Sequence, residues 1–436
     1  MRTNILHIGA GELTYEIRNI VNVGNKLQSL GLQVNWENIG DPVAKGEKIP
    51  PWMKEIVADA VQDDATYGYS PTKGVLETRQ FIADETNALG GAQIDPEDII
   101  FFNGLGDAIS KIFGFLKRTA RVIVPTPSYT THSSAEAAHA GDRPVTYILD
   151  PNHNWYPDLE DIENHVKFNP AVAGILIINP DNPTGAVYPE QIMRDIVEIA
   201  DKNDLFIICD EVYQNMVYNG TKSVPLATVI GDKVPAISMR GVSKEMPWPG
   251  SRCGWIEVFN GHRDPMFEKY INSILNAKML EVCSTTLPQI VLPRIINHPE
   301  YQDYLQERIR RYERFSNISY DILKDVKGIL VNRTNGAFYM SAAFESGRLN
   351  NKQTLPIQND DVRTTVEAMV TGPDISPDKR FVYYLLGATG VCVVPLSSFA
   401  TNLQGFRITL LERDETEFIN IFETIATAIE QYITSA

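Results

Sequence analysis

Cysteine is scarce in this chain, with four among 436 residues. The spacing of these four, at Cys209, Cys253, Cys283 and Cys392, suits neither a zinc knuckle nor a disulfide framework. The amino-terminal stretch lacks the apolar run of a signal peptide, and no segment approaches the length of a membrane-spanning helix. We therefore expect a cytoplasmic protein, in a reducing compartment, with no membrane partner.

Positive charge is also in short supply. The chain has 39 Lys and Arg against 55 Asp and Glu, which gives a formal net charge of -16 and a pI near 5.0. Such an acidic surface argues against nucleic acid as a partner. Any anionic small molecule would have to be held by a few cations placed locally.

Two common ligand motifs are incomplete. Gly9 and Gly11 begin a glycine pattern that lacks both its third glycine and a following strand–helix–strand unit, so a dinucleotide site is not expected. Residues 150–154 resemble the start of a calcium loop, but Trp155 and Tyr156 follow where glycine would be needed. We expect no metal site.

What the chain does contain is a regular alternation of strands and helices in its middle part. Helical patterns at 107–119 and 190–204 separate short apolar runs that predict strands. These runs lie at 99–104, 121–127, 145–149, 173–180 and 205–213. Continuous apolar strands with short connections are typical of an α/β fold, whose mostly parallel sheet is covered by helices on both faces.

The length of the chain exceeds that of one compact core, so more than one domain is expected. A long polar helical pattern at Tyr301–Val326 suits a linking helix, and the sequence after it mixes strands and helices as a smaller α+β domain would. We predict an N-terminal segment, 1–48, that joins the small domain, a large domain at 49–305 and a C-terminal small domain at 306–436.

Three side chains point to one cofactor. Asp210 ends a predicted buried strand, where α/β sheets place their ligands. Lys244 follows a strand-like run, and Arg252 comes eight residues later. Pyridoxal 5'-phosphate (PLP) needs an amine for its aldehyde, a carboxylate for its ring nitrogen and a cation for its phosphate, and these residues can supply all three.

Eight short stretches then bring out a resemblance over nearly the whole length. The chain resembles the class I/II aminotransferases of the PLP-dependent aspartate aminotransferase superfamily, which have fold type I. Within it, YEIRNI, NWYPDLEDI and GVSK are most similar to the alanine (glutamate–pyruvate) branch. The eight stretches are NIGDP (38–42), YGYSPTKG (67–74), NGLGDA (103–108), PTPSY (125–129), NPDNPTG (179–185), DEVY (210–213), SK…GSRCGW (243–255) and GFRITL (405–410).

The resemblance implies a role for each matching residue near the reacting atoms. Lys244 is implied as the amine that binds the cofactor and then moves the proton of the substrate. Asp210 is implied as the partner of the pyridine nitrogen. Tyr213 and Asn182 are implied as hydrogen-bonding partners of the ring oxygen, so the rigid turn around Asn182 would serve to position its amide. Asn179 is expected to tie that turn together.

The resemblance also implies how the phosphate and the ring are held. Backbone N–H groups of Gly104, Leu105 and Gly106 are at a strand-to-helix junction, where a helix dipole favours anions, and Arg252 would add a guanidinium. Tyr129 is implied to stack on the ring. Tyr69 is implied to reach the phosphate of a neighbouring subunit, with Tyr67 as the competing choice.

The substrate end depends on Arg407, which is implied to grip the α-carboxylate, beside Asn182 and the backbone of Gly40. No second arginine for a distal carboxylate stands out. We expect a homodimeric aminotransferase that acts on an amino acid and a 2-oxo acid by a ping-pong mechanism, with alanine, glutamate, pyruvate and 2-oxoglutarate preferred. Alternatives are an aspartate or aromatic aminotransferase, a C–S β-lyase, or a PLP-binding regulator without enzyme activity.

Overall fold

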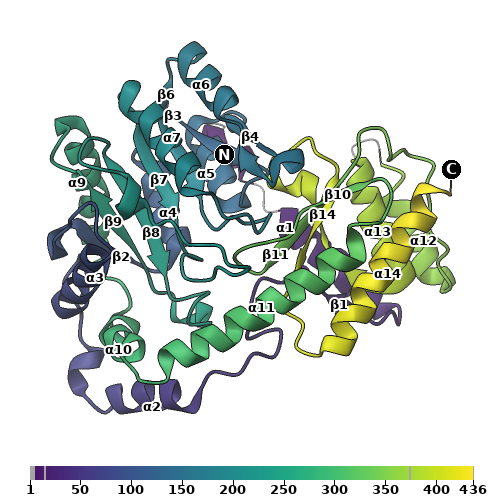
Figure 1. Cartoon of the computed structure of the whole chain (residues 1–436), viewed down its shortest axis with the longest axis horizontal. Helices are drawn as coiled ribbons and strands as arrows, with labels where there is room; N and C mark the ends of the chain where they lie inside the picture. Colours follow the sequence, from purple (N-terminus) through teal and green to yellow (C-terminus); the bar gives the residue numbers. More distant parts are fainter. Residues whose placement is uncertain (1–4, 14–15, 373–374, 436) are drawn as a thin grey trace.

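The computed structural model describes residues 5–13, 16–372 and 375–435. Tyr15, part of the YEIRNI stretch, and the first residues of the predicted N-terminal segment lie outside these ranges. Figure 1 shows two parts of the molecule. The large sheet and its helices form the left part, a smaller sheet and its helices form the right part, and helix α11 (Tyr301–Leu323) runs between the two. No helix in the described part of the chain has both the length and the apolar character needed to cross a bilayer.

The large sheet has the strand order β2-β9-β8-β7-β6-β3-β4-β5. Strands β8, β7, β6, β3 and β4 run parallel, β9 is antiparallel to both of its neighbours, and β5 is antiparallel to β4. The strands are β2 (Ile99–Phe102), β3 (Arg121–Thr126), β4 (Thr146–Asp150), β5 (Tyr156–Pro157), β6 (Val172–Ile178), β7 (Phe206–Asp210), β8 (Ala236–Gly241) and β9 (Gly254–Phe259).

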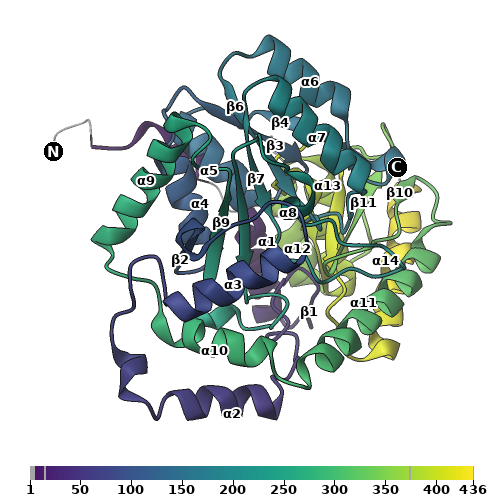
Figure 2. The same ribbon diagram turned by 60° about the vertical axis from the view of Figure 1, so that its left-hand side comes forward.

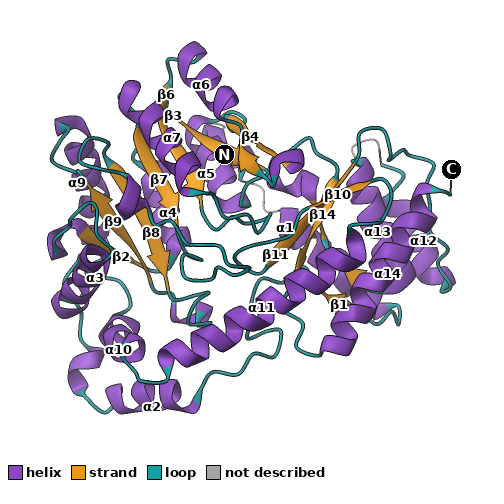
Figure 3. Ribbon diagram, viewed as in Figure 1, coloured by secondary structure: helices purple, strands orange, loops and turns teal. Residues whose placement is uncertain are grey.

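Strand β6 shows why its sequence is apolar throughout. Ile175 and Ile177 belong to the core on one face of the sheet, together with Met193 of α7 (Glu190–Lys202). Leu176 belongs to the core on the other face, under α4 (Leu105–Gly114) and α9 (Pro265–Leu280). Figure 3 shows helices on both sides of the strands. The predicted α/β fold, with a mostly parallel sheet covered on both faces, is therefore confirmed.

The smaller sheet is antiparallel in the order β10-β11-β14-β13. A separate parallel pair joins β1 (Asn35–Trp36) to β12 (Val391–Cys392), so the N-terminal segment is tied to the C-terminal part. This pairing concerns residues 35–36, whereas residues 8–12 contact α5 (Thr130–Ala140) of the large part. The grouping of 1–48 with the small domain and the boundaries at 48/49 and 305/306 stay predictions. The other elements here are β10 (Ile329–Val331), β11 (Tyr339–Phe344), β13 (Val394–Pro395), β14 (Gly405–Thr409), α12 (Asp360–Met369), α13 (Pro377–Thr389) and α14 (Glu415–Ile433).

Helices α2 and α10 lie side by side at the edge of the large part, as Figures 1 and 2 show. Trp52 of α2 stacks on His298, which follows α10, with 4.4 Å between the ring centroids. The remaining helices are α1 (Glu16–Ser29), α2 (Pro51–Ala60), α3 (Leu76–Ala88), α5 (Thr130–Ala140), α6 (Leu159–Phe168), α8 (Leu226–Val229) and α10 (Thr286–Ile296).

Candidate active site

A cavity of about 360 Å³ opens at the carboxyl ends of β6 and β7, where the large part of the molecule faces the small part. Its size lies within the usual range of small-molecule sites, about 300–1,000 Å³. Most of the predicted site residues line it: Gly40, Leu105, Gly106, Tyr129, Asn182, Asp210, Tyr213, Lys244, Arg252 and Arg407. The structure thus brings together residues that are up to 367 positions apart in the chain.

Asp210 is the last residue of β7, and its side chain is buried. His132 of α5 places its Nε2 2.9 Å from Asp210 Oδ2, and the backbone N–H of Val212 donates to Oδ1 at 3.2 Å. His132 belongs to none of the sequence motifs that carry the predicted site. The available signal was its position three residues after Tyr129 on the same helical turn, and the two rings meet edge to face at 6.0 Å.

Lys244 extends across the cavity, and its Nζ donates to the carbonyl oxygen of Gly40 at 2.8 Å. The same nitrogen lies 5.5 Å from the centre of the Phe338 ring and 6.0 Å from that of Tyr213. The Tyr213 hydroxyl donates to the hydroxyl of Tyr339 at 3.2 Å. Burial, and the neighbouring Tyr339, hold the pKa of Tyr213 well above its ordinary value, so this tyrosine keeps its proton at neutral pH.

Groups that could hold an anion meet where β2 turns into α4. Gly104 caps the helix with φ +83°, and a Cβ there would lie 2.5 Å from the guanidinium of Arg252. Arg252 Nη2 in turn donates to the carbonyl of Asn103 at 3.3 Å. The first-turn N–H groups of a helix have no partners within the helix, so bare backbone, helix dipole and guanidinium meet at one place.

Arg407 of β14 is buried and held from two sides. Its Nη1 donates to Asn182 Oδ1 at 3.3 Å, and its Nη2 donates to the carbonyl of Asn38 at 2.8 Å. Its guanidinium also lies 4.5 Å from the centre of the Tyr339 ring. A Cβ at Gly40 would come within 2.1 Å of the Tyr339 hydroxyl, so a residue without a side chain lets this segment approach the cavity.

The turn after β6 is a rigid support for Asn182. Asn179 Oδ1 accepts a hydrogen bond from the backbone N–H of Tyr188 at 2.9 Å, which is the tying role expected for Asn179. Asp181 accepts the N–H of Thr184 at 3.0 Å and also its hydroxyl. Burial raises the pKa of Asp181 to about 7, although the bonds from Thr184 act in the opposite direction.

Two predicted residues, Gly104 and Tyr69, do not line the cavity, and among the lining residues that were not predicted is a cation, Arg18. Gly104 lies behind Arg252, while Tyr69 is 85% exposed and Tyr67 is 74% exposed in this single chain. Arg18 of α1 lines the cavity. Nothing in the sequence besides the stretch YEIRNI indicates that Arg18 belongs to the site, because α1 is far along the chain from the strands that carry the other residues.

Residues 34–419 match the family described as aminotransferase class I and II. The chain belongs to this family. It is 57% identical, over 99% of its length and 100% of the relative's, to an uncharacterized aminotransferase of Methanocaldococcus jannaschii. It is 30% identical to a glutamate–pyruvate aminotransferase of Escherichia coli, over 77% of this chain and 82% of that protein. Among solved structures, an alanine aminotransferase from Pyrococcus furiosus is similar with a TM-score of 0.82 and 27% identity, covering 98% and 100% of the two chains.

The predicted family, fold type I and transaminase activity are therefore confirmed, and the enzyme is an aminotransferase of the PLP-dependent kind. A non-enzymatic regulator is not supported. The donor set of the cavity fits PLP: a helix terminus with Arg252 suits a phosphate, Asp210 suits a protonated ring nitrogen and Lys244 suits an aldehyde.

Proposed function

We propose that this enzyme transfers an amino group between L-alanine and 2-oxoglutarate, giving pyruvate and L-glutamate in a ping-pong cycle. The observation that carries the proposal is the placement of Arg407 with Asn182 opposite Lys244 and Asp210 in one cavity. The similarity to enzymes named glutamate–pyruvate and alanine aminotransferase supports the choice of substrates.

When bound, PLP supplies an aldehyde that condenses with amino groups and a ring that withdraws electrons from the Cα of the substrate. In our proposal Lys244 Nζ would take the proton from the substrate Cα and would deliver it to the carbon that the PLP aldehyde contributes. Asp210 keeps a proton on the ring nitrogen, and His132 holds the Asp210 carboxylate in place. Asn182 and Tyr213 donate hydrogen bonds to the ring oxygen.

The remaining residues bind and orient. Backbone N–H groups of the segment from Gly104 to Gly106 and the guanidinium of Arg252 hold the phosphate, and Tyr129 packs on the ring. The Arg407 guanidinium donates two hydrogen bonds to the α-carboxylate, which fixes the direction of the Cα–H bond. The backbone of Gly40 closes the same side. Arg18 supplies a cation for the distal carboxylate of glutamate and 2-oxoglutarate, the group for which the sequence offered no partner.

We further propose a cytoplasmic homodimer in which Tyr69 reaches the phosphate of the partner subunit. Thr72 of the same loop donates to the carbonyl of Val282 at 2.9 Å, so this loop lies against the end of α9. Tyr67, Tyr69 and Leu280, which are 74%, 85% and 89% exposed, lie on these two segments. Exposed apolar and aromatic side chains of this kind suit a protein interface.

A direct assay separates the proposal from its rivals. With PLP present, the enzyme should form pyruvate from L-alanine when 2-oxoglutarate is added, and it should form glutamate in equal amount. A C–S β-lyase would instead release pyruvate and ammonia from a sulfur amino acid without any acceptor. Preference for aspartate or an aromatic amino acid over alanine, by kcat/KM, would contradict the choice of substrates.

A further inference from the structure

We propose that Arg308, on the linking helix α11, is a positioning residue for Lys244. It fixes the peptide that carries the lysine and ties it to the segment that closes the substrate pocket. The inference depends on the proposed role of Lys244. Arg308 lies outside every motif of the sequence, and it does not line the cavity.

The contacts of Arg308 go to the main chain of the lysine loop. Its side chain is 2% exposed. Nη2 donates to the carbonyl oxygen of Lys244 at 3.0 Å, and Nη1 donates to the carbonyl oxygen of Glu245. A planar guanidinium can hold two neighbouring carbonyl groups in a fixed relation, whereas an ammonium group acts as a single point charge. This fork therefore restricts the orientation of the Lys244 peptide.

The other side of Arg308 is anchored by a buried carboxylate. Glu47, whose side chain is 3% exposed, forms an ion pair with Arg308 and a second with Arg311 at 2.7 Å. The hydroxyl groups of Tyr304 and Tyr312 donate to it at 3.3 Å each. Burial acts to raise the pKa of Glu47, but the two guanidiniums hold it below its ordinary value, so the carboxylate stays ionised.

Lys244, Gly40, Glu47 and Arg308 form a closed circuit of contacts beside the cavity. Glu47 lies seven residues after Gly40, whose carbonyl accepts the hydrogen bond from Lys244 Nζ at 2.8 Å. The segment 38–47 thus meets Lys244 twice, once at the amine and once, through Glu47 and Arg308, at the main-chain carbonyl. The same segment accepts a hydrogen bond from Arg407 at the carbonyl of Asn38. The lysine and the carboxylate-binding arginine are therefore placed by one piece of chain.

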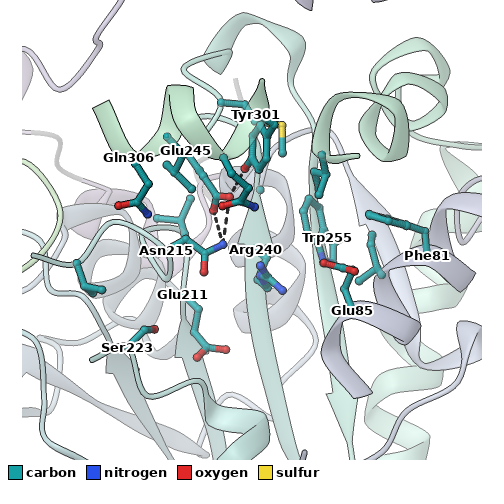
Figure 4. Close-up of a pocket in the computed structure, with 18 residues that line it drawn as sticks. Phe81, Glu85, Glu211, Asn215, Ser223, Arg240, Glu245, Trp255, Tyr301 and Gln306 are labelled. Carbon is teal, nitrogen blue, oxygen red and sulfur yellow. Dashed lines mark hydrogen bonds between the residues drawn. The ribbon is translucent and has the colours of Figure 1, made fainter. Parts of the chain in front are cut away.

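The side chain after the lysine is fixed as well, as Figure 4 shows. Asn215 Nδ2 donates to the two carboxylate oxygens of Glu245 at 3.1 and 3.0 Å, and the hydroxyl of Tyr301 donates to the same carboxylate. Tyr301 is the first residue of α11. Helix α11 therefore holds the lysine loop at two points, Tyr301 and Arg308, which are about two helical turns apart. Of the two, Arg308 is the residue that donates to the Lys244 carbonyl.

The test compares Arg308→Lys with Arg311→Lys. Both variants keep a positive charge beside Glu47, but Arg311 has its hydrogen bonds to Glu47 and Tyr312 rather than to the lysine loop. Two readouts are measured: the rate at which apoprotein mixed with PLP acquires visible absorption, and kcat and KM for L-alanine. For Arg308→Lys we expect a roughly 10- to 100-fold lower kcat with little change in KM, and slower PLP capture by about tenfold.

Arg311→Lys should stay close to the wild type in both readouts, at a similar melting temperature to Arg308→Lys. Equal losses in the two variants, or an unchanged Arg308→Lys, would overturn the inference. If Arg308→Lys does not fold, the double variant R308Q/E47Q removes both buried charges together and should show the same selective loss; normal capture and kcat in that variant would overturn it. A wild-type protein that captures no PLP would instead refute the proposed function, and this inference with it.

Discussion

Asp210 and His132 are both buried, with 2.9 Å between His132 Nε2 and Asp210 Oδ2. Asp210 belongs to a sequence motif, whereas His132 does not. A buried carboxylate that loses a hydrogen-bonding partner is destabilised by about 1–3 kcal/mol. We expect His132→Ala to lower kcat/KM for alanine roughly 10- to 100-fold. His139→Ala is the matched control, because His139 is on the same helix and contacts the carbonyl of Ala120. Equal effects of the two substitutions would argue against a role for His132 at Asp210.

We propose that Arg18 raises the affinity for substrates with two carboxylates over those with one. We expect Arg18→Met to raise KM for L-glutamate and 2-oxoglutarate roughly tenfold or more, since a hydrogen bond to a charged group contributes about 1.5–3 kcal/mol. KM for L-alanine and pyruvate should change little. Arg18→Lys, which keeps the charge, should retain part of the preference. A uniform rise for all four substrates would show that Arg18 supports the fold of the pocket rather than its selectivity.

At the scale of elements, the turn 179–185 supports Asn182 through backbone geometry. Gly185 has φ +73°, and a Cβ there would lie 2.4 Å from the carbonyl of Tyr339. Gly220 has a similar φ of +69° but open space around it. We expect Gly220→Ala to lower the free energy of unfolding by about 1–2 kcal/mol. Gly185→Ala should cost about 1–3 kcal/mol more, because overpacking adds to the backbone strain.

Denaturant unfolding of the two glycine variants measures this difference. A lower kcat/KM for L-alanine in Gly185→Ala alone would show that Asn182 has moved. The same loss of stability in both variants would mean that the turn 179–185 accommodates a Cβ at Gly185 without overpacking, which would contradict this prediction.

The elements of the large sheet could be predicted because their information is local. An apolar run predicts strand β7, with Asp210 at its end. The Asn, Pro and Gly residues after another apolar run predict the turn around Asn182. Partners that meet only after folding could not be predicted this way. His132 is 78 residues from Asp210, and Arg308 is 64 residues from Lys244. Tyr339 approaches Tyr213 from another sheet, so neither strand pattern nor spacing indicates the contact.

For the whole molecule, stability should depend on pH through Asp181. Burial raises its pKa in the folded protein from 3.8 to about 7. Between about pH 4 and pH 7 the folded chain keeps a proton that the unfolded chain releases, so the free energy of unfolding falls as pH rises across this window. Three pKa units correspond to a loss on the order of 4 kcal/mol, complete above pH 7.

Asp181→Asn should remove this part of the pH dependence. Denaturant unfolding at pH 5 and pH 8 would show the wild type losing stability relative to the variant as pH rises. Burial also raises the pKa of Glu211 to about 7, but Glu211 is present in both proteins and cancels in the comparison. Parallel stability curves for the two proteins would contradict the assignment of the effect to Asp181.

A few of the molecule's 39 cations lie at the cavity where anions are proposed to bind. Arg252 lies at the helix terminus proposed for the phosphate, and Arg407 and Arg18 line the part of the cavity proposed for carboxylates. The net charge of -16 of the whole chain therefore does not describe the local charge around these arginines. Of the three, Arg407 is buried, so its attraction for an anion is screened less by salt than that of an exposed cation.

The visible absorption of the protein with PLP, recorded before and after L-alanine and then 2-oxoglutarate, tests directly whether the enzyme transaminates alanine. We expect a visible band that alanine bleaches and 2-oxoglutarate restores, and we expect Lys244→Ala to lack the restoration. A band that alanine leaves unchanged would contradict the alanine assignment. Absence of any band in the wild type with excess PLP would contradict the role of Lys244.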